Sequence, residues 1–394
     1  MIVLDLRHAI TRAVVESGWD AGTEPKLRPG GQPGTYASSI ALSLSTAAVN
    51  AATASTAARS TAARSPVTGN TVTGNTATGN LEALAIARTL AGRLATEDWI
   101  ARATATGNGY ITVTVTPQAL ASVAARVTAA GAGCVSSDVL RADVVAPMPP
   151  ADLEGAATWE DARAALAAEL AAALAVAAGA TVAASEAGAT VAASGGATAE
   201  LTAAGGAEPT VAASEAAELA AASGGGARTR RRGPAGDAMA FAGADAVRFA
   251  LARAIPGKPV RIDPVSVARY SLDNPAYAVR YAHARAVSGM RWAAALAKPG
   301  EAALPCLPAD PAGWALLDAL SWLPERVAVA ARRGRPDELA RYLEELASAT
   351  IAALPFVGPA GGERLALVQA TAQAARTALA AGLGLLGVAA PDRL

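Results

Sequence analysis

The stretch of the chain with the most chemically versatile side chains is residues 274–285, NPAYAVRYAHAR. Two tyrosines, two arginines and one of the two histidines of the chain fall within these twelve residues, although aromatic residues make up only 4% of the sequence. Asn274 is a good helix N-cap and Pro275 suits the first helical position. The stretch therefore predicts the beginning of a long helix.

Helical spacing sorts these side chains onto two faces. Tyr277, Tyr281 and Arg285 share one face, and Arg280 and His283 share the next. Rings and guanidinium groups on one face can stack on unpaired bases and contact phosphates, as in many proteins that bind single-stranded RNA. The same side chains can instead pack between helices, with His283 hydrogen-bonded in the core. The spacing taken alone favours this structural role.

The elements around this stretch, over residues 237–394, are also predicted to be helices. A second cap–proline pair stands at Asp310-Pro311, and a leucine stripe follows until Pro324, which is expected to end that helix. Another apolar stripe covers residues 339–346, and a final helix is expected over about 363–383. This region is predicted to be an all-α bundle.

The first 145 residues predict a smaller α+β domain. Residues 109–116 alternate in polarity as a strand does, and a helical period begins at Leu81. Residues 45–80 repeat STAAR and then TGN, so we expect a disordered insertion there. The predicted fold class is mainly α, with this small α+β domain at the front.

Residues 146–236 separate the two domains and are expected to be a low-complexity linker. They contain TVAAS three times and long alanine runs, which have little apolar area to bury. A lone helix within them is the alternative. The cluster RTRRR at 228–232 is a solvated charge run or a phosphate-binding patch.

Composition limits the function classes. The formal net charge is zero, so a site for a polyanion must be a local basic patch, and DNA is not an expected partner. The two cysteines are far apart and have no neighbouring histidine, and the sequence indicates neither a metal site nor a cofactor. No segment resembles a membrane span or a signal peptide, so a cytoplasmic location is expected.

The stretch NPAYAVRYAHAR resembles the first long helix of the α-helical (DALR) anticodon-binding domain of class I arginyl-tRNA synthetases, whose pattern is NPvyYVQYAHAR. The resemblance continues in GADAVRFALAR at 243–253, in RIDPVSVARYSLDNP at 261–275 and in the glycine- and leucine-rich chain end. At the front, GTYASSIALSL at 34–44 and GNGYITVTV at 107–115 resemble the additional N-terminal domain of the same enzymes, which contacts the outer corner of tRNA.

This resemblance implies a set of tRNA-binding residues and a partner, tRNA, with tRNA-Arg as the cognate. In the anticodon-binding domain they are Asn274, Tyr277, Arg280, Tyr281, His283, Arg285, Arg291 and Leu394. In the front domain they are Tyr36, Tyr110 and Thr112, and the expected phosphate contacts are Arg228, Arg230, Arg231 and Arg232. The chain departs from the family at Ala278, where an aromatic residue is usual.

The catalytic part of the family has no counterpart in this sequence. Its ATP site uses an H-x-G-H motif, whereas His8 and His283 are the only histidines here. Its K-M-S-K-S-type loop needs lysines, and none stands between Lys26 and Lys258. We therefore expect a non-catalytic paralogue that binds tRNA in a regulatory or accessory role. The alternative is a protein-interaction subunit of a synthetase or biosynthetic enzyme that has lost RNA binding.

Overall fold

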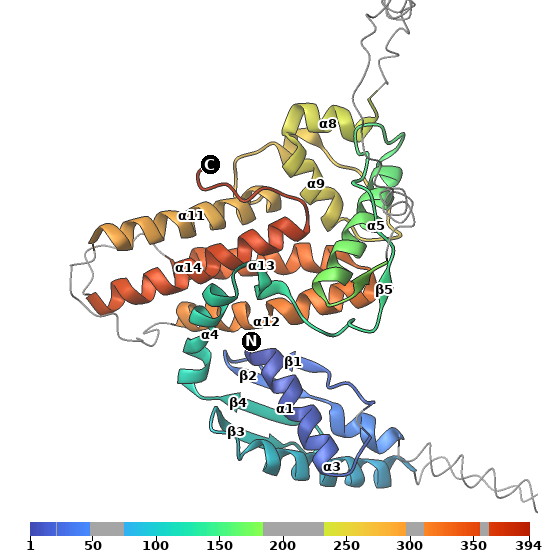
Figure 1. Ribbon diagram of the computed structural model, residues 1–394, viewed down its shortest axis with the longest axis vertical. Helices are drawn as coiled ribbons and strands as arrows, with labels where there is room; N and C mark the ends of the chain where they lie inside the picture. Colours follow the sequence, from blue (N-terminus) through green and yellow to red (C-terminus); the bar gives the residue numbers. More distant parts are fainter. Residues whose placement is uncertain (21, 48–74, 184–231, 297–310, 355–361) are drawn as a thin grey trace, which may run out of the picture.

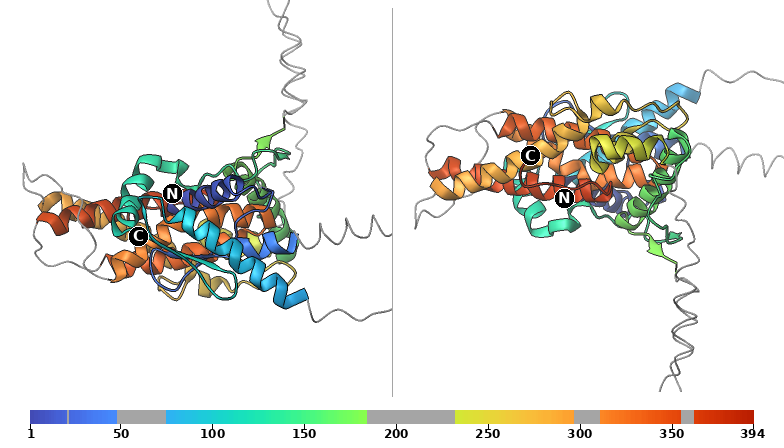
Figure 2. Two further views of the ribbon diagram at one scale, coloured as in Figure 1. Left: turned by 90° about the horizontal axis from the view of Figure 1, so that it is seen from below. Right: turned by 90° about the horizontal axis from the view of Figure 1, so that it is seen from above.

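The computed structural model describes residues 1–20, 22–47, 75–183, 232–296, 311–354 and 362–394. Within these ranges most residues are helical and one four-stranded sheet lies near the N-terminus (Figure 1). The expected fold class, mainly α with a small α+β part at the front, is confirmed. The N-terminal unit lies below the helical bundle in Figure 1 and in front of it when the molecule is seen from below (Figure 2).

The N-terminal unit is an antiparallel sheet with helices packed on it. Its strands are β1 (Leu27–Pro29), β2 (Thr35–Ser38), β3 (Ile100–Ala105) and β4 (Ile111–Val115), in the order β1-β2-β4-β3. Helix α3 (Asn75–Leu94) packs on β3 and β4, and α1 (Ile2–Glu16) packs beside α3. Ile111, Val113 and Val115 of β4 are buried and its two threonines are half-buried, as the alternating pattern predicted.

Helix α3 begins earlier than the hydrophobic period predicts. It starts at Asn75, whereas the first apolar residue of the period is Leu81. Nucleation of a helix fixes three residues for one hydrogen bond, whereas each residue added afterwards contributes one bond for one residue fixed. The helix therefore extends beyond its packed part into the expected insertion, of which residues 48–74 lie outside the described residues.

The bundle consists of long helices in close contact. Helix α11 (Pro275–Leu296) lies along α14 (Gly362–Leu385) and also contacts α13 (Pro336–Ala353), which pairs with α12 (Pro311–Arg333). Shorter helices α8 (Pro234–Ala242), α9 (Ala244–Arg253) and α10 (Pro264–Val267) lie at one end. Helix α4 (Pro117–Ala130) and the 3-10 turn η1 (Gly131–Val135) connect the N-terminal unit to α12 and α14.

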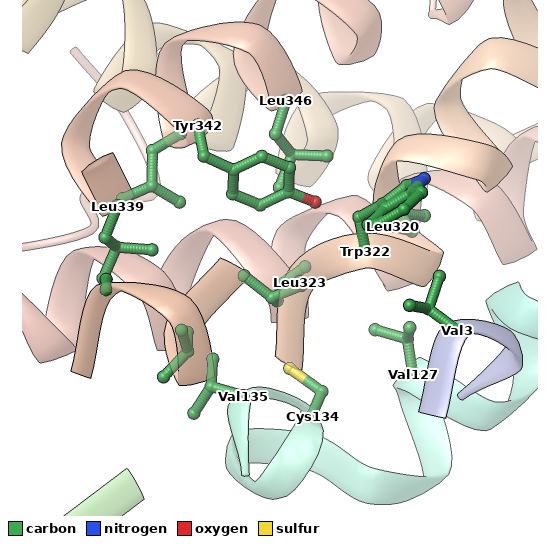
Figure 3. Packing of buried hydrophobic residues seen from close by; sticks show 14 of the residues in the cluster. Val3, Val127, Cys134, Val135, Leu320, Trp322, Leu323, Leu339, Tyr342 and Leu346 are labelled. Atoms are coloured by element: carbon green, nitrogen blue, oxygen red, sulfur yellow. The ribbon is translucent and has the colours of Figure 1, made fainter. Parts of the chain in front are cut away.

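Helix α12 is the centre of the core and continues through Pro324, so the expected helix end there was wrong. Leu320, Leu323 and Val327 on either side of the proline are fully buried. Figure 3 shows Leu320, Trp322 and Leu323 among side chains from α1, α4, η1 and α13. An interior proline costs about 3 kcal/mol. Burying several leucine-sized side chains at about 1.5–3 kcal/mol each outweighs that cost.

Part of the expected linker is a core helix. Helix α5 (Trp159–Ala177) begins with a capping box between Thr158 and Asp161, and packs on α9, α12 and α13. Leu166, Leu170 and Leu174, spaced by four residues, are at most 1% exposed. The expectation of a tether is therefore wrong for this segment, because three leucines give the alanine-rich helix enough area to bury. Residues 184–231 lie outside the described residues.

Two short parallel strands flank α5 in the sequence. Strand β5 (Val144–Val145) precedes α5 in the sequence and pairs with β6 (Thr181–Val182), which follows the C-terminal end of α5.

In the part of the chain that the structure describes, no helix is both long and apolar enough to cross a bilayer.

Candidate nucleic-acid interface

Three tyrosines form a row at the beginning of α11. The rings of Tyr277 and Tyr281 are stacked, with centroids 5.8 Å apart and an interplanar angle of 22°. Tyr270, in the loop before the helix, meets Tyr277 edge to face at 5.7 Å. Tyr270 is 85% exposed, so its ring faces are open to solvent. We call Tyr270, Tyr277 and Tyr281 the tyrosine row.

The tyrosine row leads into a pocket of about 590 Å³ between α11, α14 and the chain end. A volume of this size accommodates a small planar ligand such as a nucleobase. We call it the α11 pocket. Its lining residues are Tyr277, Tyr281, Ala284, Arg285, Ser288, Gly289, Arg291, Trp292, Leu354, Val368, Arg393 and Leu394.

Arg285 fixes one wall of the α11 pocket. Its Nε donates to the carbonyl of Leu354, 2.8 Å away, at the C-terminal end of α13. Its terminal nitrogen Nη1 lies 3.4 Å from the hydroxyl of Tyr281. The guanidinium therefore holds α11 against α13 and brings positive charge to the pocket wall.

The chain end forms another wall because His283 anchors it. His283 is 2% exposed and its Nδ1 lies 2.9 Å from the carbonyl of Pro391. Burial lowers the pKa of His283, with the hydrogen bond to Pro391 acting in the opposite direction. The neutral ring is therefore favoured relative to a free imidazole, and Nδ1–H is the donor because a carbonyl oxygen can only accept. A direct contact between His283 and tRNA is not compatible with this position.

Asn274 also has a structural role. Its side chain is 7% exposed, and its Nδ2 donates to the carbonyls of Val267 and Arg269, each 2.8 Å away. These bonds hold the loop that carries Tyr270. Asn274 thus positions the tyrosine row rather than presenting its own amide to a ligand.

The remaining predicted arginines of α11 are engaged in ion pairs. Arg280 lies 3.4 Å from Asp245 at the beginning of α9 and is half-buried. Arg291 lies 3.2 Å from Asp392, and both side chains are about half exposed. Exposed pairs are weak in water, so Arg291 remains open to exchange its partner for a phosphate.

Tyr36 is not on the surface, so the expectation that it contacts tRNA is not met. It is 0% exposed, and its hydroxyl donates to Oδ1 of Asp318 in α12, 3.0 Å away, and lies 3.2 Å from Oγ of Ser321. Its ring packs against Trp322 at 5.7 Å. Tyr36 therefore joins the N-terminal sheet to the bundle. A tyrosine in an alternating strand pattern gives no sign of which partner covers it.

Charges strengthen this junction. Arg7 of α1 pairs with Glu325 of α12 and with Glu24, and Arg332 pairs with the same two carboxylates. Burial raises the pKa of Glu325, although its arginine partners oppose the shift. The N-terminal unit is thus docked on α12 by a polar network in which Arg7 and Glu325 are buried and Glu24 and Arg332 are partly exposed.

Tyr110 and Thr112 lie on the sheet, away from the tyrosine row. Tyr110 follows the β3–β4 turn, where Gly109 has φ of +81°, and is half-buried. Thr112 pairs with Ala37 and Thr104 and is half-buried on the face opposite Tyr36. Arg232 is exposed just before α8, whereas Arg228, Arg230 and Arg231 lie outside the described residues.

Sequence patterns did not identify Tyr270 and Trp292 as members of this interface. Tyr270 is in a loop, so helical spacing could not relate it to Tyr277. Trp292 lines the α11 pocket two turns beyond Arg285. Extending the face of Tyr281 and Arg285 by four and then three residues would have found it.

Comparison with known proteins identifies similarity in the C-terminal part of the chain. Residues 279–394 match the DALR anticodon binding domain. The chain is 40% identical over 170 residues to the arginine–tRNA ligase of Frankia alni and 38% identical over 165 residues to that of Kineococcus radiotolerans. In each case the match covers 40% of this chain and 30% of the relative. The chain thus spans about a third of the length of the curated relatives that it matches.

A solved structure, the arginyl-tRNA synthetase of Thermus thermophilus, is 30% identical to this chain, with a TM-score of 0.34. The match covers 46% of this chain and 31% of that one. The sequence matches thus identify residues 279–394 as similar to a DALR anticodon-binding domain, and about 40% of the chain as similar to part of arginine–tRNA ligases.

Proposed function

We propose that this chain binds tRNA, with the tyrosine row and the α11 pocket taking unpaired bases of the anticodon loop. The observation that carries the proposal is the row itself, Tyr270, Tyr277 and Tyr281, which leads into a pocket within a domain of the anticodon-binding type. A loop of unpaired bases presents flat faces, which such rings recognise by stacking.

The energetics support this arrangement. Stacking of a base on an aromatic side chain contributes about 1–3 kcal/mol. The open faces of Tyr270 offer one such platform, and the α11 pocket holds Tyr281 and Trp292 for another base. Arg291 and Arg393, which also line the pocket, add positive charge that attracts the phosphates linking these bases. In this proposal, the rings of Tyr270 and Trp292 provide the stacking that is lost at Ala278, where the family has an aromatic residue.

We further propose that this chain does not aminoacylate by itself and acts as a regulatory or accessory protein. Only two histidines are available for an H-x-G-H motif. His8 is exposed on α1, and His283 is buried against Pro391. His8 and His283 are 275 residues apart in the chain and cannot form this motif, which supports the proposal of RNA binding without aminoacylation.

Titration of labelled tRNA-Arg with the protein at low salt, followed by fluorescence anisotropy, tests the proposal. Tyr281→Phe keeps the ring and should bind like the wild type, because the hydroxyl makes only a 3.4 Å contact with Arg285. Tyr281→Ala should raise Kd by about 5- to 150-fold, which is the loss of one stacked base. Equal binding by both variants would show that this ring does not contact RNA.

A second candidate function is a protein-interaction subunit of a synthetase or biosynthetic enzyme without RNA binding. The observation in its favour is a set of exposed apolar side chains on α8, on α10 and in the loop that carries Tyr270: Phe241 is 64% exposed, and Val265 and Leu272 are each 53% exposed. If the wild-type chain is folded but does not bind tRNA, this function is favoured over the first.

A further inference from the structure

A second groove lies at the N-terminal end of α11. It has a volume of about 520 Å³ and is formed by α9, the loop 254–263, α10, the beginning of α11 and Arg341 of α13. Four of its lining residues are cationic, and Asp263 is the acidic one. The cations are Arg253, Lys258, Arg261 and Arg341. We call it the basic groove.

The charge of the basic groove is only partly neutralised. Arg253 pairs with Glu344, and Arg341 lies 3.9 Å from Asp337, which is held more closely by Arg335 at 2.7 Å. Because Asp337 is paired with Arg335, two carboxylates remain at the groove, Asp263 and Glu344, and the four cations leave a surplus of two positive charges.

Asp263 does not face the free cations. Its carboxylate caps α10, accepting from the backbone N–H groups of Val265 and Ser266 and from the Ser266 hydroxyl. Lys258 and Arg261 are exposed and form no ion pair with any other residue in the described ranges. They are the two cations available to a ligand.

The backbone of the basic groove is held in place by α5. Arg163 donates to the carbonyls of Ile255 and Lys258, at 3.0 and 2.6 Å, and Glu160 accepts from the N–H of Val260 at 3.2 Å. A loop that is already ordered loses little conformational entropy when a ligand binds. Helix α5, which was expected to be part of a linker, thus preorganises the basic groove.

The basic groove ends where the tyrosine row begins on α11. Asn274, Pro275 and Ala276 line the groove, and Tyr277 follows directly. Tyr281 is only about 8 Å further along the helix than Ala276, at 1.5 Å per residue. A single strand that stacks its bases on the row would therefore bring its backbone over Lys258 and Arg261.

We propose that the basic groove binds phosphates of the RNA backbone next to the bases that the tyrosine row accepts. This inference rests on the proposed function, because the ligand is the same tRNA. The cations line an open, exposed groove rather than a closed cage, which suits an extended polyanion more than one small anion. Neither the matched domain, which begins at residue 279, nor the predicted site residues include Lys258 and Arg261.

The test compares Lys258→Ala/Arg261→Ala with the wild type in tRNA titrations at several salt concentrations. Each lost phosphate contact reduces the slope of log K against log salt by about 0.7–0.9. The double variant should therefore lose about 1.5 units of slope and bind about tenfold more weakly at low salt. The charge-preserving variant Lys258→Arg/Arg261→Lys should behave like the wild type.

A matched control removes two exposed arginines outside the basic groove, Arg88 and Arg141. Arg88→Ala/Arg141→Ala should leave the slope unchanged. If the wild type binds tRNA and Lys258→Ala/Arg261→Ala keeps the wild-type slope and Kd, the groove proposal is overturned while the proposed function stands. If the wild type binds no tRNA, both are overturned. Tyr281→Ala should weaken binding without changing the slope, which separates base stacking from phosphate binding.

Discussion

Tyr36→Phe tests the junction between the N-terminal unit and the bundle. The substitution keeps the ring against Trp322 and removes the hydroxyl that donates to Asp318 at 3.0 Å. Asp318 then keeps the hydrogen bond from the backbone N–H of Gly34, also 3.0 Å away. A hydrogen bond to a charged group contributes about 1.5–3 kcal/mol. We therefore expect the free energy of unfolding to fall by about 2 kcal/mol at pH 7.

The loss should depend on pH. Burial raises the pKa of Asp318 above its usual value, and the hydrogen bond from Tyr36 partly opposes that shift. A raised carboxyl pKa means that the stability contributed by this group is full below its unfolded pKa and is lost as pH rises through its folded pKa. Removing the Tyr36 hydroxyl raises the folded pKa further. The variant should therefore lose less stability at pH 5 than at pH 7.

Tyr342→Phe is the matched control for this measurement. The Tyr342 hydroxyl also donates from a buried ring, but its acceptor is the uncharged carbonyl of Ala319. Its removal should cost about 1 kcal/mol at both pH values. Urea unfolding followed by circular dichroism measures all three proteins. A loss below 0.5 kcal/mol for Tyr36→Phe, or one that does not change with pH, would refute the junction as described. Tyr36→Phe should also leave tRNA affinity unchanged.

Three further predictions concern other parts of the molecule. Tyr270→Ala should raise the Kd for tRNA by about 5- to 150-fold with unchanged urea unfolding, because its ring is 85% exposed and serves only as a stacking platform. Burial lowers the pKa of His283, so the stability that this residue contributes is full above its unfolded pKa and falls as the pH is lowered. The wild type should therefore lose free energy of unfolding between pH 7 and pH 5, and His283→Asn should lose less of it. Leu170→Ala in α5 should reduce the free energy of unfolding by about 2–5 kcal/mol, whereas a linker helix would show no change.

The sequence predicted the parts of the fold in which local pattern and packing agree. Strand β4 follows its alternating residues, and α11 begins at the proline after Asn274. Pro324 and α5 show where local pattern fails. A proline is a strong local signal, but α12 is buried on several sides, and packing outweighs the lost hydrogen bond. The leucines of α5 have the spacing of a buried helix face, but the alanine-rich composition around them favoured the prediction of a linker.

The candidate site was predictable only where its residues share one helix. Tyr277, Tyr281 and Arg285 lie within α11, and their common face followed from spacing. Tyr270 joins them through a loop, and Leu394 joins them because His283 holds the chain end against α11. Tyr36 shows the reverse case, because its burial depends on α12, almost 300 residues away in the chain. Contacts of this kind depend on tertiary structure, which single-sequence patterns do not contain.

The most direct test of the account is one titration of the wild-type chain with tRNA-Arg across a range of salt concentrations. We expect saturable binding in which log K falls linearly with log salt concentration, with tRNA-Arg bound more tightly than other tRNAs. Absence of binding at low salt, or equal affinity for every tRNA, would contradict it.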